Sequence, residues 1–396
     1  MELDKLKEFM NSLTAWIIPG NSICVYYKGK EIFTYASGYA DIENKIPMST
    51  DKYINIYSCT KVTTAVSVLQ LSEKRYFSLD DPLYDFIPEY RDMTVIDSAG
   101  NIEKAKNAIT IRHLLTMTAG LTYNLNSEGI KEALKETNGN ADTLTMIKKL
   151  AKDPLIFEPG TDWNYSLCHD VLGGVIEVVS GMKFSEYCKK NVFEPLGINA
   201  EFHITNKIKA KMATQYEYKT ATSGSDDVKN QISSSKDNGE VVVNNVNNHR
   251  LGAKYDSGGA GIVTTVKAYA RLADALANGG IGVTGEKIIS RKTIELMSEN
   301  QLNDKQMKSF NWSQLKGYGY GLGVRTLISK ELSGSNGSVG EIGWGGAAGA
   351  TLLSDSKTGF SYFYAHHMLN PQEDYYQPRL RNAAYESFYK YKEESI

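Results

Sequence analysis

The chain has 396 residues, of which 41% are hydrophobic and 10% aromatic, and its formal net charge is −2. This length exceeds one ordinary hydrophobic core and indicates two domains or one large composite domain. Because no block of lysines or arginines creates a concentrated basic face, the sequence gives no basis for binding nucleic acid or an anionic membrane surface.

The first twenty residues are not expected to form a targeting signal, because charged residues are spread through them. Apolar residues recur there at helical spacing and predict an amphipathic helix that packs on the body of the protein. No apolar run reaches about 18 residues, so we expect no membrane span. The residues of the helical pattern are Leu3, Leu6, Phe9, Met10 and Leu13.

The four cysteines show no C-x-x-C spacing and none of the density of a disulfide scaffold. We therefore expect them to be reduced and the protein to be cytoplasmic. They are Cys24, Cys59, Cys168 and Cys188.

β-rich runs at 22–27 and 31–35, joined around Lys28-Gly29-Lys30, predict a hairpin near the start of the chain. Apolar residues at helical spacing then predict a mostly helical middle, and polar residues dominate 219–249, which predicts a mobile surface loop. β-patterns return late in the chain, before a final helix. The predicted helices are 62–71, 110–118, 130–152, 171–180, 264–278 (capped by Thr264 or Thr265) and 377–391, and the late strands are 318–325, 342–353 and 360–366.

Strands at both ends of the chain, with helices between them, predict one α/β domain built from both termini. We place this domain at residues 1–56 and 255–396. A mostly helical domain, residues 57–254, is inserted between its two parts and carries the loop at about 219–249.

The sequence Ser58-Cys59-Thr60-Lys61 opens a long apolar run and forms an S-x-x-K pattern. If a helix continues from it, Ser58 and Lys61 lie one turn apart and face the same way. A serine hydroxyl needs a base within hydrogen-bond reach, which a partly desolvated lysine with a lowered pKa can provide. The pattern alone is weak, because three more copies occur, at Ser180/Lys183, Ser233/Lys236 and Ser354/Lys357.

Two sequences compete as the edge on which a substrate would lie. Lys357-Thr358-Gly359 spells the K-T-G motif of penicillin-recognising enzymes, but its surroundings favour a hairpin turn. Trp344-Gly345-Gly346-Ala347 begins a predicted strand, where two residues without side chains let a substrate approach the backbone. Packing or bulge glycines are the alternative for this second sequence.

Tyr165 precedes a buried helix in a tight loop and is the candidate base, although a core tyrosine is the alternative. Cys59, beside Ser58, is an alternative nucleophile that one helical step should point elsewhere. The glycines of 317–323 alternate at strand period, which argues against a phosphate loop. His366-His367 would face opposite sides of a strand, which argues against a shared metal. G-x-S-x-G, H-E-x-x-H and P-loop motifs are absent.

Three motifs occur in the order and spacing of the class C β-lactamase-like serine hydrolases, which the chain resembles over nearly its whole length. They are Ser58-Cys59-Thr60-Lys61, Tyr165-Ser166-Leu167 and Trp344-Gly345-Gly346. This group also includes D,D-peptidases, D-aminopeptidases and family VIII carboxylesterases. Flanking phrases that also resemble the family are Gly38-Tyr39-Ala40-Asp41, Leu79-Asp80-Asp81-Pro82, Ile111-Arg112-His113-Leu114-Leu115, Pro159-Gly160, Pro195-Leu196-Gly197 and Gly258-Gly259.

The resemblance implies an α+β fold of the β-lactamase/penicillin-binding-protein type, with an antiparallel sheet flanked by helices and an inserted helical domain. It implies that Ser58 attacks an acyl carbon while Lys61 and Tyr165 share the role of general base. Backbone N–H groups of Ser58 and Ala347 would form the oxyanion hole, beside Trp344-Gly345-Gly346. It implies no metal and no organic cofactor.

Two departures from the family pattern bear on the substrate. Leu167 replaces an asparagine that would contact an acyl side chain, and Trp344 replaces the Lys or His that often begins the third motif. Both versions resemble the esterase branch, so we expect a carboxylesterase acting on a small ester, amide or lactam.

Several alternatives to the esterase stay open. One alternative is a D,D-peptidase, D-amino-acid amidase or weak β-lactamase acting on cell-wall-like substrates. In that case Arg250 or Arg325 would supply the positive charge that Trp344 does not provide for the substrate carboxylate. Acyl transfer to an alcohol or amine uses the same chemistry. From another class, the chain could be a non-catalytic acyl-binding or sensing protein. The sequence leaves the natural substrate and the oligomeric state open.

Overall fold

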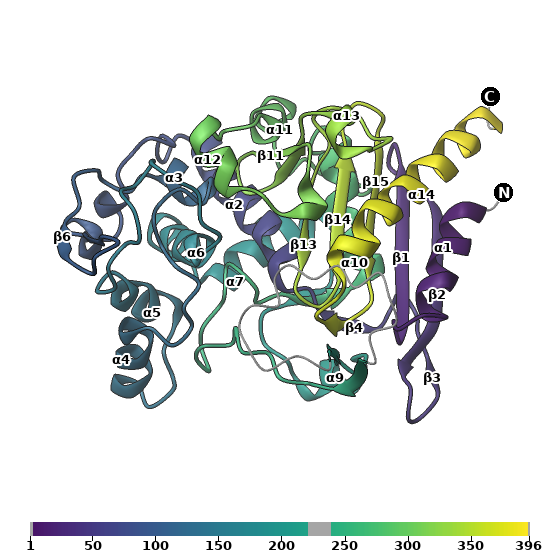
Figure 1. The fold of residues 1–396 in the computed structure, drawn as a ribbon, viewed down its shortest axis with the longest axis horizontal. Coiled ribbons are helices and arrows are strands. Elements are labelled where there is room, and N and C mark those ends of the chain that lie inside the picture. Colours follow the sequence, from purple (N-terminus) through teal and green to yellow (C-terminus); the bar gives the residue numbers. More distant parts are fainter. Residues whose placement is uncertain (1–2, 221–238, 395–396) are drawn as a thin grey trace.

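A computed structural model describes residues 3–220 and 239–394 (Figure 1). Its largest element is an eight-stranded sheet whose neighbouring strands are all antiparallel. Strands from both ends of the chain meet in this sheet. In spatial order they are β11 (Tyr318–Tyr320), β12 (Arg325–Leu327), β13 (Ile342–Gly346), β14 (Ala350–Asp355), β15 (Phe360–Ala365), β1 (Gly20–Tyr27), β2 (Lys30–Asp41) and β3 (Ile46–Pro47).

Side chains alternate between the two faces of the sheet because successive residues of a strand point to opposite sides. On β1, Ile23 and Val25 pack with the two terminal helices, whereas Cys24 and Tyr26 join the larger core on the other face. The terminal helices pack on each other and on one face of the sheet, on the side of the molecule where both chain ends lie (Figure 1), and α10 packs on the opposite face. These helices are α1 (Asp4–Thr14), α14 (Glu373–Glu394) and α10 (Val266–Ala277).

A helical region lies beside the sheet, at the left of Figure 1, and is centred on α2 and α6. Every residue of α2 from 60 to 71 is buried, so this helix is enclosed on all sides. In chain order the elements from β3 to this region's end are β4 (Tyr53–Asn55), η1 (Tyr57–Cys59), α2 (Thr60–Glu73), η2 (Leu83–Asp85), η3 (Pro88–Tyr90), β5 (Thr94–Ile96), β6 (Ile102–Lys104), α3 (Ile111–Leu115), α4 (Glu128–Glu136), α5 (Thr143–Leu150), α6 (Cys168–Ser180), α7 (Phe184–Cys188), η4 (Lys189–Phe193) and α8 (Glu194–Leu196).

Short strands outside the main sheet tie distant segments together. They form the sheets β4-β10-β7, β16-β8-β9 and β5-β6 among the described residues. The remaining elements are β7 (Ala200–Glu201), α9 (Asn206–Lys209), β8 (Tyr216–Lys219), β9 (Glu240–Val243), β10 (Val263–Thr265), α11 (Arg291–Ser298), α12 (Asp304–Ser309), η6 (Ser313–Leu315), α13 (Lys330–Ser333) and β16 (Met368–Leu369).

Several local predictions are confirmed. The first hairpin turns at Lys28-Gly29, and α6 ends where Gly181 adopts φ 68°, a left-handed conformation that favours glycine. The N-cap of α10 is Thr265, whose side chain accepts a hydrogen bond from the N–H of Ala268. Residues 356–359, which contain the K-T-G sequence, form the turn between β14 and β15.

Two predicted strands are wrong because each is a hairpin. Residues 318–325 turn at Gly321-Leu322-Gly323, where the N–H of Gly321 donates to Val324 O at 2.8 Å and separates β11 from β12. Residues 342–353 turn after Gly346, and Gly349 there has φ 79°. Apolar residues and glycines continue through both turns, and the turn residues other than Ala347 are buried, so the apolar pattern does not end at either turn.

The predicted helix 130–152 is wrong in length, because it is two helices, α4 and α5, separated where Asn138 and Gly139 take positive φ values. The predicted loop at 219–249 is partly wrong. Residues 240–243 form β9, which pairs with β8, and residues 221–238 lie outside the described residues. The polar composition of 219–249 thus includes residues that form a strand, because their pairing with β8 is a tertiary contact that composition does not reveal.

The arrangement in Figure 1 separates a sheet built from both ends of the chain from helices contributed by its middle. The boundaries at 56/57 and 254/255 stay a prediction. All four cysteines are buried and unpaired. Among the described helices, none combines the length and the apolar character that crossing a membrane would require.

Candidate active site

Ser58 lies in a single 3-10 turn, η1, directly before α2. The preceding residue, Tyr57, has φ 46°, a conformation that costs a non-glycine residue of the order of 1–3 kcal/mol. Its buried hydroxyl donates to Gln215 Oε1 at 2.8 Å and helps to hold this backbone in place. The turn therefore presents Ser58 at the start of a buried helix, half-buried and facing a pocket.

Lys61 is fully buried one turn after Ser58. Its Nζ lies 3.3 Å from Ser58 Oγ and 3.3 Å from the hydroxyl of Tyr123, and it donates to the carbonyl oxygen of Gly259 at 2.9 Å. The ammonium also lies 4.6 Å from the ring centroid of Tyr165. The predicted i, i+3 geometry of the serine and the lysine is thus present in the structure.

Lys61 does not have the lowered pKa that the sequence suggested. Burial by itself lowers the pKa of this ammonium, but Tyr123, Tyr165 and Asp170 act in the opposite direction and raise it above the ordinary lysine value. Lys61 is therefore a fixed positive charge at neutral pH. It can stabilise an anion beside it, but it does not itself accept the proton of Ser58 while it remains charged.

Asp170, on α6, organises the loop on which Lys61 rests. Its Oδ1 accepts hydrogen bonds from the hydroxyls of Tyr255 and Ser257, both at 2.6 Å, and from the N–H of Gly259 at 3.2 Å. A Cβ at 259 would overlap the carboxyl group of Asp170, so only glycine fits at this close approach. The loop then turns the carbonyl of Gly259 toward the ammonium of Lys61.

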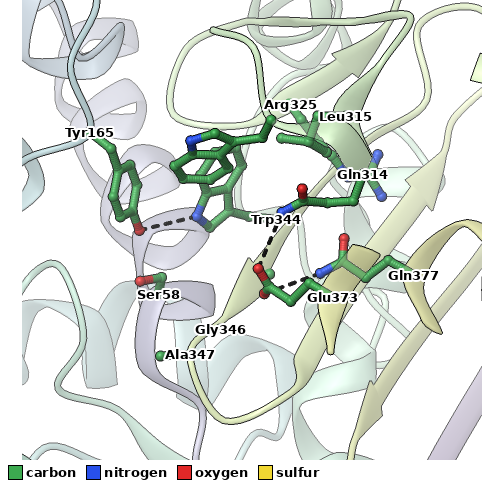
Figure 2. A pocket seen from close by; sticks show the side chains of 12 residues that line it. Ser58, Tyr165, Gln314, Leu315, Arg325, Trp344, Gly346, Ala347, Glu373 and Gln377 are labelled. Atoms are coloured by element: carbon green, nitrogen blue, oxygen red, sulfur yellow. Dashed lines mark hydrogen bonds between the residues drawn. The ribbon is translucent and has the colours of Figure 1, made fainter. Parts of the chain in front are cut away.

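Tyr165 lies between the lysine and the third motif. Its ring stacks on Tyr123 with centroids 5.3 Å apart, and its hydroxyl accepts a hydrogen bond from Trp344 Nε1 at 3.3 Å (Figure 2). This hydrogen bond holds the hydroxyl of Tyr165 in the position near Ser58 that Figure 2 shows. The three predicted motifs thus meet at one place.

The pocket at this place has a cavity volume of about 170 Å³. Ser58 and Ala347 lie together at its lower edge in Figure 2, and Trp344 lies between Tyr165 and the side chains of α14. Both residues line the pocket, as an oxyanion hole made of their backbone N–H groups would require. The lining residues are Ser58, Tyr165, Trp312, Gln314, Leu315, Arg325, Trp344, Gly345, Gly346, Ala347, Glu373 and Gln377.

Glycine at 346 lets β13 pack on the segment that carries the serine. A Cβ there would overlap the carbonyl oxygen of Ile56, two residues before Ser58. A second link joins the same segments, since the thiol of Cys59 donates to the carbonyl of Trp344 at 3.4 Å. The spacing between the third motif and Ser58 therefore depends on the missing side chain.

We expect Gly346→Ala to reduce kcat/KM for an ester by about 100-fold, since a displacement of about 1 Å between reacting groups costs that much. Gly173→Ala on α6 is the matched control, because a Cβ there meets its nearest atom at 3.6 Å, an ordinary contact. Kinetics and thermal unfolding of both variants check the prediction. Equal activity of the two variants would contradict a role for the close approach at 346.

Four other candidate residues from the sequence do not offer a free side-chain group to the pocket. Leu167 is 3% exposed and does not line the pocket, and Arg250 does not line it either. Arg325 does, but its guanidinium is buried in an ion pair with Glu341 at 2.6 Å. Burial raises the pKa of Cys59 well above the ordinary thiol value, and its sulfur faces Trp344 O, so it is no alternative nucleophile.

Sequence reasoning missed several residues at the site, including two rings near Lys61 and two side chains of the C-terminal helix. Tyr123 contacts Lys61, and His249 packs edge-on against Tyr123 with ring centroids 5.6 Å apart, although it falls in the predicted mobile loop. Glu373 and Gln377 reach the pocket from the C-terminal helix. None belongs to a short motif with the catalytic residues, so no sequence signal could have placed them there.

The two adjacent histidines have separate structural partners. His367 Nε2 accepts from the N–H of Asn55 at 3.1 Å, and His366 Nδ1 lies 3.1 Å from the hydroxyl of Tyr364. Burial lowers the pKa of His366 to about 3 and that of His367 to about 4. Within residues 3–220 and 239–394, no three His, Cys, Asp or Glu side chains are grouped so that they could hold a metal ion.

Comparison with known proteins places this geometry in a family. Protein Rv1367c of Mycobacterium tuberculosis is 26% identical over 362 residues, covering 88% of this chain and 86% of that protein. Esterase EstB of Burkholderia gladioli is 33% identical over 176 residues, 43% of each chain. The fold matches the structure of EstCE1, described as a hydrolase with promiscuous acyltransferase activity, with a TM-score of 0.77, 24% identity, and coverage of 96% and 98%. The Beta-lactamase family model matches residues 11–386, and the chain therefore belongs to the Beta-lactamase family.

Proposed function

We propose that this protein is a serine hydrolase that cleaves carboxylic esters through an acyl-enzyme at Ser58. The observation that carries the proposal is the contact of Ser58 Oγ with the buried Lys61 Nζ, at 3.3 Å, beside the hydroxyl of Tyr165 in an open pocket. The positive charge of Lys61, 4.6 Å from the ring centroid of Tyr165, stabilises negative charge that develops beside it while the tyrosine oxygen acts as the base.

In acylation, Tyr165 accepts the proton of Ser58 while Ser58 Oγ forms a bond to the acyl carbon. The negative charge that develops on the carbonyl oxygen is stabilised by the backbone N–H groups of Ser58 and Ala347. The bond to the leaving oxygen then breaks, and Tyr165 returns the proton to the departing alcohol. In deacylation, water gives a proton to Tyr165 and attacks the acyl carbon, and Ser58 recovers a proton as the acid leaves.

The preference for esters follows from what surrounds the serine. Trp344 occupies the position of the cation that would hold the carboxylate of a β-lactam or of a D-alanyl peptide. Arg325, the one guanidinium among the lining residues, is already neutralised by Glu341. The similarity to EstB, whose name states an esterase, supports the same reading.

A substrate panel tests this preference. We expect efficient hydrolysis of nitrophenyl esters of short acids, and kcat/KM values at least about 100-fold lower for a chromogenic cephalosporin and for D-Ala-D-Ala peptides, since an unpaired substrate carboxylate costs several kcal/mol on binding. Initial rates under one set of conditions provide the comparison. Hydrolysis of the cephalosporin with inert esters would instead support the β-lactamase or D,D-peptidase alternative.

Covalent labelling by a fluorophosphonate, seen as one adduct by intact mass, separates a hydrolase from a non-catalytic acyl-binding protein. We also propose a cytoplasmic location, because none of the four cysteines forms a disulfide bond. Product analysis with added alcohols would reveal acyl transfer, which competes with water for the same acyl-enzyme.

A further inference from the structure

The substrate pocket contains a carboxyl group that the proposed chemistry does not use. Glu373, at the start of α14, lines the pocket across from Ser58 (Figure 2). Its Oε2 accepts a hydrogen bond from Gln314 Nε2 at 3.2 Å, and its Oε1 accepts one from Gln377 Nε2 at 3.3 Å. No ion pair to this carboxyl group occurs within the described part of the chain.

The fold makes room for this carboxyl group beside the third motif. A Cβ at Gly345 would lie 2.8 Å from Gln377 Nε2 and 3.2 Å from Glu373 Oε1, so glycine lets both side chains approach the strand. The two glutamine amides hold the carboxyl group in place through their nitrogens, which leaves their carbonyl oxygens as further acceptors. The group is thus built into the wall of the pocket rather than left on a mobile surface.

Aromatic rings complete the same wall. Trp312 is half-buried, and its ring centroid lies 5.2 Å from that of Tyr165 and 5.8 Å from that of Trp344. All three residues line the pocket with Glu373. Ring faces attract cations through their quadrupole, and the attraction grows when water is excluded. Three rings and one carboxyl group form a chemical environment that suits a positive charge.

Neighbouring groups leave Glu373 without a fixed counter-charge. Tyr376 and Cys59 are neutral at ordinary pH, because burial raises the pKa of each above its usual value. Asp374 adds negative charge. Two guanidinium groups on adjoining elements have other partners: Arg325 pairs with Glu341, and Arg381 donates to the backbone carbonyl of Gln314.

We propose that the pocket binds substrates carrying a quaternary or primary alkylammonium group, held between Glu373 and the rings of Trp312 and Trp344. An ester with such a cation would place its carbonyl at Ser58 and its charge at α14. This inference rests on the proposed function for the reaction, but cation binding itself requires no catalysis. An anionic substrate would meet the same carboxyl group and bind less well.

The binding of a cation should depend on pH. Burial, with a smaller effect of Asp374, raises the pKa of Glu373 to about 7. The carboxyl group is therefore largely neutral about one unit below that value and largely ionised about one unit above it. Affinity for a cation should rise as pH increases through this range, and affinity for an uncharged ligand of the same shape should not change.

Choline and 3,3-dimethylbutan-1-ol provide a matched pair, because they share a shape and differ in charge. We expect the wild-type protein to bind choline at least about tenfold more tightly at pH near 8, by titration calorimetry, and to lose most of this preference near pH 6. Glu373→Gln should reduce the preference to about twofold or less. Glu386→Gln, an exposed glutamate on the same helix, is the control and should keep it.

Hydrolysis provides the second measurement. The ratio of kcat/KM for acetylthiocholine to that for 3,3-dimethylbutyl thioacetate should exceed about ten in the wild type and fall about tenfold in Glu373→Gln. Equal binding of choline and the alcohol, or tighter binding of 3,3-dimethylbutanoate, would overturn the inference. Hydrolysis of neutral esters without a choline preference would overturn it alone. Choline binding by a protein that cleaves no ester would overturn the proposed function and support the cation site.

Discussion

Ser58→Ala is expected to lower kcat/KM for a nitrophenyl ester by about 10⁴-fold or more, because the variant lacks the oxygen that forms the acyl-enzyme. The remaining pocket and backbone N–H groups can still bind the ester, so KM should change much less than kcat. Fluorophosphonate labelling provides a second readout, and the adduct seen by intact mass should disappear completely. Both effects follow from one missing atom at the start of α2.

Ser180→Ala is the matched control, because Ser180 and Lys183 form another S-x-x-K sequence. Ser180 ends α6, and its hydroxyl donates to the carbonyl of Ile176 instead of facing a lysine. This variant should keep full labelling and at least half of the activity. Persistence of the adduct in Ser58→Ala would show that another residue is the nucleophile.

Tyr165→Phe is expected to lower kcat by about 10²- to 10⁴-fold, the contribution of a positioned general base. Tyr123→Phe should cost about tenfold, because it removes a hydrogen-bond partner of Lys61 but leaves the base in place. The two rings are stacked beside the same ammonium, so the pair forms a sharp comparison. Steady-state kinetics on one ester, with circular dichroism to verify folding, provide the test.

The two variants can distinguish the base because the hydroxyl that lies 3.3 Å from Lys61 Nζ belongs to Tyr123. The hydroxyl of Tyr165 instead accepts from Trp344, 3.3 Å away. If Tyr123→Phe costs more than Tyr165→Phe, the base would be Tyr123, and Tyr165 would position Trp344. Labelling of Ser58 should be slowed in whichever variant lacks the base.

The sequence by itself determined the order of the elements that carry the motifs. Local chemistry explains this success, because a buried helix ending at Gly181, or a hairpin turning at Lys28-Gly29, depends on residues close together in the chain. The same holds for Ser58 and Lys61, whose approach is set by one helical turn. Residue type also placed Trp344 and its glycines in a strand, although they end β13 instead of beginning a longer strand.

Only the tertiary structure decided the lysine's charge state and the content of the pocket. The ammonium of Lys61 keeps its proton because Tyr123, Tyr165 and Asp170 surround it, and these residues come from separate segments. Glu373 reaches the pocket because β13 and α14 are brought together by the sheet, about thirty residues after Trp344 in the chain. Electrostatic energies depend on distance and burial, which a linear pattern does not contain.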